Sequence, residues 1–396
     1  MSEGQYRIVA LGYNYFRQCS SLLNANFLES FVPVHSEDAG LWDQAEGPPV
    51  ALAAGGHFSL ALTKKGDVYV WGTLQDKVYL GVERIDFGLP NKVQIATFSA
   101  GWRHAGAVST DGHVYTWGSA DHGCLGHGNA DFLTVPKRVE YFINASQGKN
   151  PGQENFEGSI CQISCGGMHT GVLTTDGSVF MFGLNNKMQC GQRAKNQTFL
   201  PSKLNLSTLD PSETVAQLFC GRQHSMLLTQ NGAVYSWGCN KFYQLGCSDA
   251  KVVGFPKLVE LLNGSRTIQE CVKLSLGWDH TLALTALGYL IGWGSNAYNQ
   301  LLAQDRRFLP PSVIIAGRTF CDVQASKHHS LAVSSVDNSI STWGVPNGGA
   351  GLSPGHTEAE EAAKSRETIT TLEQGCSFVA AALGEAHALL LVEKKT

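Results

Sequence analysis

The densest group of metal-binding side-chain types in this 396-residue sequence is a short run that holds Asp121, His122, Cys124 and His127. A structural zinc site needs four such ligands that converge on one point. The run is rich in glycine, and Cys124 falls in a stretch that recurs elsewhere in the chain. We therefore interpret the run as structural and predict no metal site.

The sequence also lacks the motifs of the common catalytic centres. It contains no P-loop, no nucleophile elbow and no paired acid–base signature. Its eleven cysteines are scattered and include no Cys-x-x-Cys pair, a usage that is typical of small buried residues in a reducing compartment. We therefore expect no covalent catalysis and no cofactor.

Histidine is the chemically capable residue that recurs at one place in a repeated pattern. Seven copies align on it: His57, His104, His169, His224, His280, His329 and His387. Seven imidazoles at one repeat position are not seven catalysts, whereas a buried imidazole that hydrogen-bonds a neighbouring strand suits every copy. Tryptophan recurs before a glycine that ends an apolar run, and we expect these rings to pack between structural units. They are Trp71, Trp117, Trp237, Trp293 and Trp343.

These repeated residues imply the element that positions them. Within residues 99–128, two apolar runs at 105–108 and 114–117 flank Asp111-Gly112, which supplies the positive-φ positions of a tight hairpin turn. Successive aligned histidines lie 47 to 65 residues apart. A period near fifty residues that is built from short strands and glycine turns indicates a propeller blade rather than a helical solenoid.

The two ends of the chain carry complementary parts of this unit. The repeated glycine first occurs at Gly12 with no histidine before it, and the last histidine, His387, has no Trp-Gly after it. A strand at 6–12 that pairs with the C-terminal blade would close a ring and remove two exposed sheet edges. The prediction is an all-β, seven-bladed propeller of four-stranded antiparallel blades.

We assign residues 1–396 to this one domain, with three less regular stretches. Residues 20–50 are expected to form an irregular connection. A polar insertion at about 140–159 accounts for the longest spacing and is expected to project from the rim. Residues from about 357 to 373 are predicted to form a short helical connection, which Thr357 and Glu360 could cap.

Composition narrows the classes of partner. The formal net charge is -4 and no block of lysine and arginine occurs, so the electrostatic footprint of a nucleic-acid binder is missing and no direct nucleic-acid contact is expected. No run approaches the roughly 20 apolar residues of a membrane span. The first residues show no signal-peptide pattern. We expect a monomer in the cytoplasm, the nucleus or both.

The repeat as a whole resembles that of the regulator of chromosome condensation family. The resemblance rests on Gly-x-x-His, a hairpin, Trp-Gly and then Asn-x-x-x-Gln-Leu-Gly, as at Asn240 to Gly246, and it extends over essentially the whole chain. It implies a seven-bladed propeller sealed by the chain termini. The founding member is a guanine-nucleotide exchange factor for the nuclear GTPase Ran and binds nucleosomes. Another member is the plant ultraviolet-B photoreceptor, and many others are scaffolds or regulatory subunits.

Two functions of different class follow from this resemblance. The first is a protein-interaction scaffold or regulatory subunit that binds partners through its rim loops. The alternative is a guanine-nucleotide exchange factor for a small Ran-like GTPase, with Asp76 and Asp121 as the GTPase-contact residues, because both follow Trp-Gly on loops of one face. Loops after strand ends are commonly acidic, so we interpret each aspartate as an ordinary loop residue and name no catalytic residue.

A third function, ultraviolet-B reception, depends on a cluster of tryptophans. Trp102 and Trp278 lie in Gly-Trp-Arg-His and Gly-Trp-Asp-His, the position that the photoreceptor uses for its light-absorbing cluster. The equivalent positions of the other repeats are taken to be Gly55, Gly167, Arg222, Lys327 and Glu385. Because Trp102 and Trp278 are three blades apart, we expect them not to form one stacked cluster.

Overall fold

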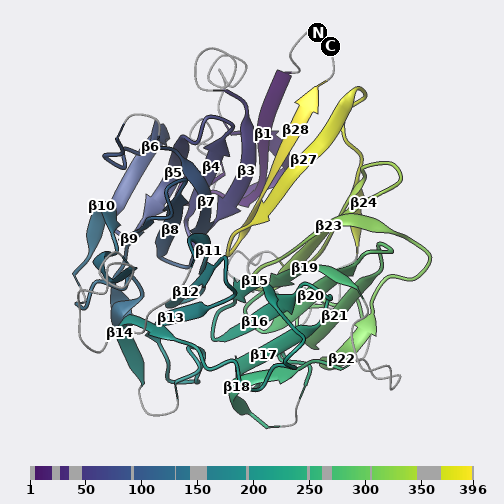
Figure 1. The fold of residues 1–396 in the computed structure, drawn as a ribbon. Helices are drawn as coiled ribbons and strands as arrows, with labels where there is room; N and C mark the ends of the chain where they lie inside the picture. Colours follow the sequence, from purple (N-terminus) through teal and green to yellow (C-terminus); the bar gives the residue numbers. More distant parts are fainter. Residues whose placement is uncertain are drawn as a thin grey trace, which may run out of the picture.

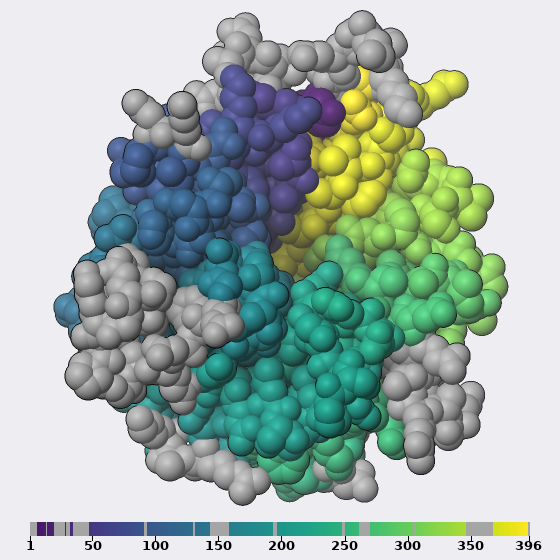
Figure 2. Space-filling model, in the orientation of Figure 1, coloured from purple at the N-terminus to yellow at the C-terminus, as the bar shows by residue number. Residues whose placement is uncertain are grey.

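The chain forms seven four-stranded antiparallel sheets arranged in a ring, which confirms the predicted seven-bladed β-propeller (Figure 1). The structure is a computed structural model, and it describes residues 5–19, 27–34, 47–90, 93–129, 131–142, 158–192, 196–247, 250–260, 270–303, 306–345 and 367–394. The blades follow one another around the ring in sequence order, so each packs on the next along the chain (Figure 2).

Six blades are built from consecutive strands. Blade one contains β3 (Pro49–Ala54), β4 (Phe58–Thr63), β5 (Val68–Leu74) and β6 (Lys77–Arg84). Blade two contains β7 (Ile95–Ala100), β8 (His104–Ser109), β9 (Val114–Gly118) and β10 (Leu133–Arg138). Blade three contains β11 (Ile160–Cys165), β12 (His169–Thr174), β13 (Val179–Leu184) and β14 (Gln197–Lys203).

The next three blades repeat this order. Blade four contains β15 (Val215–Cys220), β16 (His224–Thr229), β17 (Val234–Cys239) and β18 (Val252–Leu258). Blade five contains β19 (Cys271–Leu276), β20 (His280–Thr285), β21 (Leu290–Ser295) and β22 (Phe308–Val313). Blade six contains β23 (Phe320–Ala325), β24 (His329–Ser334), β25 (Ile340–Gly344) and β26 (Thr368–Thr370).

The seventh blade joins the two ends of the chain, as the offset of the repeats predicted. It has the order β2-β1-β28-β27, where β1 is Gln5–Tyr13, β2 is Phe27–Pro33, β27 is Cys376–Leu383 and β28 is His387–Lys394. Strand β1 pairs antiparallel with β28, and Gly12 lies opposite His387. The purple N-terminal strand therefore lies beside the yellow C-terminal ones (Figure 1).

Two expectations about the connections are wrong in part. The stretch 20–50 is not merely an irregular connection, because it includes β2, the outer strand of blade seven. The helix expected at about 357–373 does not extend to its predicted end, since residues 368–370 form β26 and pair with 340–342 of β25. Residues 357–366 lie outside the described residues.

The rim insertion is described only at its edges. Residues 140–142 form one helical turn, and Phe142 is buried edge-on against Phe180 with ring centroids 5.6 Å apart. Residues 143–157 lie outside the described part of the chain. Among the described residues, no helix has the length and apolar character to cross a membrane.

The two middle strands of each blade are the most buried, because neighbouring blades cover both of their faces. Every described residue of β8 and β9 is buried, for example. The turn that joins β8 to β9 contains Gly112 at a φ of 82°, a conformation that glycine adopts without steric cost. The apolar clusters bridge successive blades, as where Leu173 and Met181 of blade three pack with Leu218 and Trp237 of blade four.

Candidate functional site

The loops that precede the second strand of each blade converge at the mouth of the central channel. Backbone hydrogen bonds link these loops from blade to blade: the Trp102 amide donates to the Gly166 carbonyl at 3.1 Å, and the Trp278 amide donates to the Ser326 carbonyl at 3.0 Å. The Glu385 amide donates to the Gly55 carbonyl at 3.1 Å and so links blade seven to blade one. These bonds hold the loops of the joined blades together at the channel.

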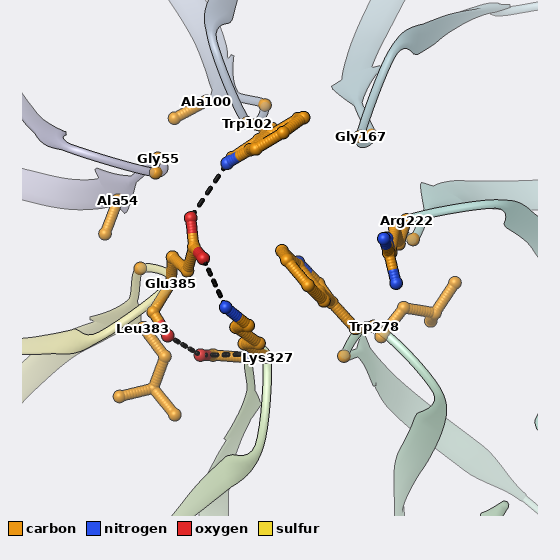
Figure 3. Close-up of a pocket in the computed structure, with 18 of the residues that line it drawn as sticks. Ala54, Gly55, Ala100, Trp102, Gly167, Arg222, Trp278, Lys327, Leu383 and Glu385 are labelled. Atoms are coloured by element: carbon orange, nitrogen blue, oxygen red, sulfur yellow. Dashed lines mark hydrogen bonds and ion pairs between the residues drawn. The ribbon is translucent and has the colours of Figure 1, made fainter. Parts of the chain in front are cut away.

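Each blade contributes one residue of these loops to the mouth. The register of the strands aligns seven positions, which we call the mouth ring: Gly56, Trp102, Gly167, Arg222, Trp278, Lys327 and Glu385. Five of these residues carry large or charged side chains, and these point toward one another across the channel (Figure 3). The ring encloses a depression of about 120 Å³.

Trp102 and Trp278 meet at this mouth, although we expected that two tryptophans three blades apart would not form one stacked cluster. Their ring centroids are 6.2 Å apart and the ring planes are inclined by 81°, an edge-to-face contact. Separation by three blades matters little here, because the inner loops of all seven blades approach the same axis. The indole rings touch edge to face rather than as a parallel stack.

Charged groups surround the two indoles. Glu385 Oε2 accepts a hydrogen bond from Trp102 Nε1 at 2.8 Å, and Glu385 Oε1 pairs with Lys327 Nζ at 2.7 Å (Figure 3). Lys327 Nζ also lies 4.3 Å from the Trp278 ring centroid, and the Arg222 guanidinium lies 4.0 Å from it. Both cations are placed to interact favourably with the π system of Trp278.

The residues next to the mouth ring include His57 and His328. Burial, together with a smaller effect of the neighbouring Lys327, lowers the pKa of His328 to about 3. Burial also lowers the pKa of His57, while Glu385 acts in the opposite direction. Both imidazoles are therefore neutral at pH 7, so the charge at the mouth comes from Arg222, Lys327 and Glu385.

The mouth is suited to a side chain rather than to a cofactor. Its depression is well below the roughly 300 Å³ at which small-molecule pockets begin. Within the described residues, no three of the His, Cys, Asp and Glu side chains are grouped closely enough to hold a metal ion. What the site offers is an aromatic contact, a cationic group and a carboxylate on a rigid frame.

The four candidate metal ligands around residue 121 are directed to separate partners. His122 Nδ1 lies 3.1 Å from Gln197 Oε1, and His127 Nε2 lies 3.0 Å from the Thr116 hydroxyl. The Cys124 thiol is buried and donates to the Ser119 carbonyl. Asp121 is exposed and lies 4.0 Å from Arg103.

Most of the aligned histidines are buried and bonded to the following blade. The Nε2 atoms of His104 and His169 lie 2.9 Å from Thr170 and Ser225, and those of His280 and His387 lie 3.0 and 2.9 Å from Ser330 and Ser59. Burial lowers the pKa of His104 to about 4 and that of His169 to about 3. These imidazoles are neutral structural groups.

His57 does not occupy the position that the sequence alignment gave it. Phe58 lies opposite Gly72 in the β4–β5 pair, where His104 lies opposite Gly118 in blade two, so Phe58 is the residue equivalent to the histidines. His57 sits one residue earlier and stacks on Phe16 with ring centroids 3.9 Å apart. The equivalent of Trp102 in blade one is therefore Gly56, not Gly55.

The five repeated tryptophans are buried, and four of them bond the preceding blade. Their indole Nε1 atoms donate to backbone carbonyls at 2.8–2.9 Å: Trp71 to Gln18, Trp237 to Gln189, Trp293 to Gln244 and Trp343 to Gln300. Trp117 differs, since its Nε1 has no partner among the described residues. The corresponding loop of blade one, Leu74 to Lys77, is a tight hairpin and is shorter than the loops that carry these carbonyls in the other blades.

Asp76 and Asp121 lie on the same face as the mouth ring. Each follows the end of a third strand, and those ends pair with the starts of the second strands, where the mouth loops lie. Both side chains are exposed. Asp76 caps the β5–β6 hairpin, and Asp121 lies in a short 3-10 turn at residues 121–123.

Sequence reasoning noted Arg222, Lys327 and Glu385 only as positions that lack tryptophan. It missed their convergence with Trp102 and Trp278. The signal was present, because one fixed position of a repeat carries five different residue types while its neighbour two residues later is histidine in six blades. Such divergence marks a place where the fold does not dictate the side chain.

Comparisons with known proteins agree with this architecture. The profile of the regulator of chromosome condensation (RCC1) repeat matches residues 111–173, 176–228 and 231–284, and a second profile of that repeat matches 50–73, 215–244 and 271–300. Together they cover more than half of the chain. Two solved propellers superpose on essentially all of it: Prp20p of Saccharomyces cerevisiae, at a TM-score of 0.77 and 20% identity, and human WBSCR16, at 0.76 and 16%. The match spans 93% and 100% of those chains and shows the fold alone.

Curated relatives are similar at the level of sequence. The ultraviolet-B receptor UVR8 of Arabidopsis thaliana is 29% identical over 306 residues, which are 74% of this chain and 63% of that protein. The RCC1 domain-containing protein RUG3 of Arabidopsis thaliana is 27% identical over 364 residues, 86% of this chain and 75% of that protein. The human E3 ubiquitin-protein ligase HERC2 matches 72% of this chain, which corresponds to only 6% of its own length. From its repeats, its closure and these matches, the chain belongs to the RCC1 repeat family.

Proposed function

We propose that this protein is a protein-interaction module or regulatory subunit whose partner docks on the face of the mouth ring. The observation that carries the proposal is the divergence of that ring on an otherwise repeated frame. Trp102, Trp278 and Arg222 present aromatic and cationic groups at the surface, and such residues are enriched at the centres of protein interfaces. The small depression suits one inserted side chain of the partner.

Equivalent residues of other blades suggest substitutions that should leave the propeller fold intact. Blades one and three carry glycine in the mouth ring, at Gly56 and Gly167. Arg222→Gly and Trp278→Gly therefore copy residues that the same loop already accepts. The control is Val336→Ser, because Val336 is 85% exposed on the turn between β24 and β25, at the opposite face.

The experiment is quantitative affinity capture with the wild-type chain and these variants. We expect partners retained by the wild type and by Val336→Ser to be lost, by tenfold or more, from Arg222→Gly/Trp278→Gly. Partners whose recovery is unchanged by the glycine variants would contradict docking at the mouth ring. Circular dichroism and thermal unfolding of each variant establish that the propeller is intact.

Guanine-nucleotide exchange on a small GTPase is a second candidate function. Its support is that Asp76 and Asp121 are both exposed on the face of the mouth ring. The assay is release of a fluorescent GDP analogue from a panel of small GTPases. Acceleration that Asp76→Ala or Asp121→Ala abolishes would support exchange, and no acceleration by the folded wild type would exclude it for that panel.

Ultraviolet-B reception is a third candidate, and the contact between Trp102 and Trp278 favours it more than the sequence did. The indoles touch, and two cations lie against Trp278. Irradiation with ultraviolet-B light followed by size-exclusion chromatography tests for a light-driven change in assembly. No difference between the irradiated and dark samples would remove this candidate.

A further inference from the structure

A second surface feature lies at the outer edge of the face that carries the mouth ring, where blades four and five meet. The loop after β17 places Phe242 and Tyr243 against Phe308, the first residue of β22. Phe242 and Phe308 stack with centroids 6.2 Å apart, and Tyr243 and Phe308 lie 5.5 Å apart. We call Phe242, Tyr243 and Phe308 the rim cluster.

The rim cluster is exposed although it is aromatic. Tyr243 is 44% exposed and Phe308 is 39% exposed. Beside it is a hollow of about 480 Å³, lined by Tyr243, Phe308, Leu309, Pro310 and Pro311 among others. An apolar hollow at the surface is a typical feature of a binding site and contributes nothing to the core.

Equivalent joints show that the fold does not require aromatic residues here. Between blades two and three, His122 and Gln197 occupy the places of Phe242 and Phe308, and they form a polar contact of 3.1 Å. Between blades three and four, Lys187 and Val252 occupy these places. The pairing of Phe242 with Phe308 is therefore not required at these two joints, although Phe16 and Tyr298 are also aromatic at the place of Phe242 in blades seven and five.

Cations border the rim cluster. Lys241 Nζ lies 5.1 Å from the Phe242 ring centroid, Arg306 and Arg307 directly precede Phe308, and the Lys251 carbonyl accepts the Asn240 amide beside Lys241. All four side chains are exposed. None of them forms an ion pair with a carboxylate of the described residues. Asp249 and Asp305 are close to Lys251 and Arg306 in the sequence, and both lie outside the described residues.

Asp279 is an acidic residue of the described part of the chain whose charge interacts with that of Lys241. It is largely buried, it lies 3.5 Å from Gln244 Nε2, and burial raises its pKa. One carboxylate does not neutralise four exposed cations. Among the described residues, the border therefore has an excess of positive charge, within a protein whose net charge is negative.

From the apolar hollow and this border, we propose that the rim cluster binds an acidic segment of a partner protein. One large apolar side chain of the segment would enter the hollow beside Tyr243 and Phe308, and flanking Asp or Glu residues would pair with Lys241, Lys251, Arg306 and Arg307. A peptide fits better than a single-stranded nucleic acid, because Phe242 and Phe308 stack on each other and the hollow is lined by proline and leucine. This proposal is independent of docking at the mouth ring.

The chain supplies variants for the test. Tyr243 has a φ of 63°, and Asn299 occupies the same loop position in blade five with a φ of 57°, so Tyr243→Asn keeps the backbone unstrained. Phe308→Gln copies Gln197, and Arg307→Asn copies Asn196, both from the equivalent strand start of blade three. Each substitution is thus already accepted at its place in the repeat.

The probes are fluorescein-labelled heptapeptides with a central Trp, Phe, Leu or Tyr between acidic triplets. Matched peptides carry a central Ser, or lysine triplets in place of the acidic ones. We expect at least one acidic apolar peptide to bind the wild-type chain by fluorescence anisotropy. Binding should fall tenfold or more with Tyr243→Asn/Phe308→Gln and several-fold with Arg307→Asn, and it should weaken as salt rises.

Three results would overturn the proposal. They are the absence of binding by every acidic apolar peptide up to about 1 mM, equal binding by the serine-centred peptides, and tighter binding of an oligothymidine to the same surface. Arg222→Gly/Trp278→Gly serves as the control, because these mouth-ring variants should bind the peptides like the wild type. Failure at the rim cluster and failure at the mouth ring are thereby separate observations.

Discussion

Two rings of equivalent residues surround the channel, and they differ in composition. In every blade, the member of one ring lies two residues before the member of the other. The inner buried ring is histidine in six blades and phenylalanine in blade one, whereas the mouth ring carries glycine, tryptophan, arginine, lysine and glutamate. Four of the histidines, His104, His169, His280 and His387, hydrogen-bond the next blade, and the mouth ring faces solvent at the channel. Residues repeat where blades must join and diverge where only a partner could constrain them.

A network of hydrogen bonds explains why the buried ring repeats. At the joint of blades three and four, His169 Nε2 lies 2.9 Å from the Ser225 hydroxyl, and this hydroxyl donates to the Gln189 carbonyl. That carbonyl also accepts the Trp237 indole N–H at 2.9 Å. Losing any one member leaves a buried polar group unpaired, which costs roughly 1–3 kcal/mol.

The largest expected effect is a loss of protein stability in acid, caused by the buried histidines. An unfolded histidine titrates near pH 6.5, whereas burial lowers the pKa of His169, His224, His280 and His387 to about 3 and that of His329 to about 4. Between these values the unfolded chain binds more protons. The free energy of unfolding should therefore fall with decreasing pH, by about 1.4 kcal/mol per pH unit for each histidine.

Urea unfolding at pH 7.5, 6.0 and 5.0 measures this slope. His329→Phe is the matched variant, because it would place phenylalanine opposite Ala388, as Phe58 already packs with Ala105 in blades one and two. It should keep the fold at pH 7.5 and reduce the slope by one histidine's share. A slope that the variant leaves unchanged would show that the ring is not the source of the acid sensitivity.

The next largest effect is a difference in stability between substitutions of two tryptophans at the blade joints. Trp293 and Trp117 are both fully buried, but Trp293 donates to the Gln244 carbonyl, whereas Trp117 Nε1 has no partner among the described residues. Trp293→Phe loses packing volume and a hydrogen bond, while Trp117→Phe loses only volume. We expect Trp293→Phe to be more destabilising by about 1 kcal/mol in chemical denaturation. Equal losses would show that the indole bond contributes little to these joints.

The sequence was sufficient to predict the structure of segments that follow the repeat, and the predictions failed where one copy departs from it. The offset of Gly12 and His387 was enough to predict that β1 pairs with β28, because both are copies of one motif. The register of blade one was misjudged, since Gly55-Gly56-His57 imitates the motif while Phe58 fills the histidine position. Strand β2 was missed because its segment shares no motif residue with the other outer strands.

The composition of the mouth site was present in the sequence, but its geometry was not. Trp102 and Trp278 are 176 residues apart, and only convergence of the inner loops on one axis brings their rings to 6.2 Å. The number of blades between Trp102 and Trp278 measures their distance around the ring and not across its centre, so it did not indicate this contact. The same reasoning missed Phe242 and Phe308, which meet because the loop of one blade overlies the outer strand of the next.

The smallest expected effect is on stability at the mouth ring itself. Glu385 joins Trp102 and Lys327, and the side chains of Lys327 and Glu385 retain 23% and 15% exposure, so water at the channel screens the ion pair only in part. Glu385→Gln keeps an acceptor for the Trp102 indole and should lower the free energy of unfolding by less than about 1 kcal/mol. Because Lys327 would lose its carboxylate beside Trp278, the tryptophan emission should shift even though stability barely changes. A loss above about 2 kcal/mol would place Glu385 among the groups that hold the blades together, and the contrast between the two rings would then fail.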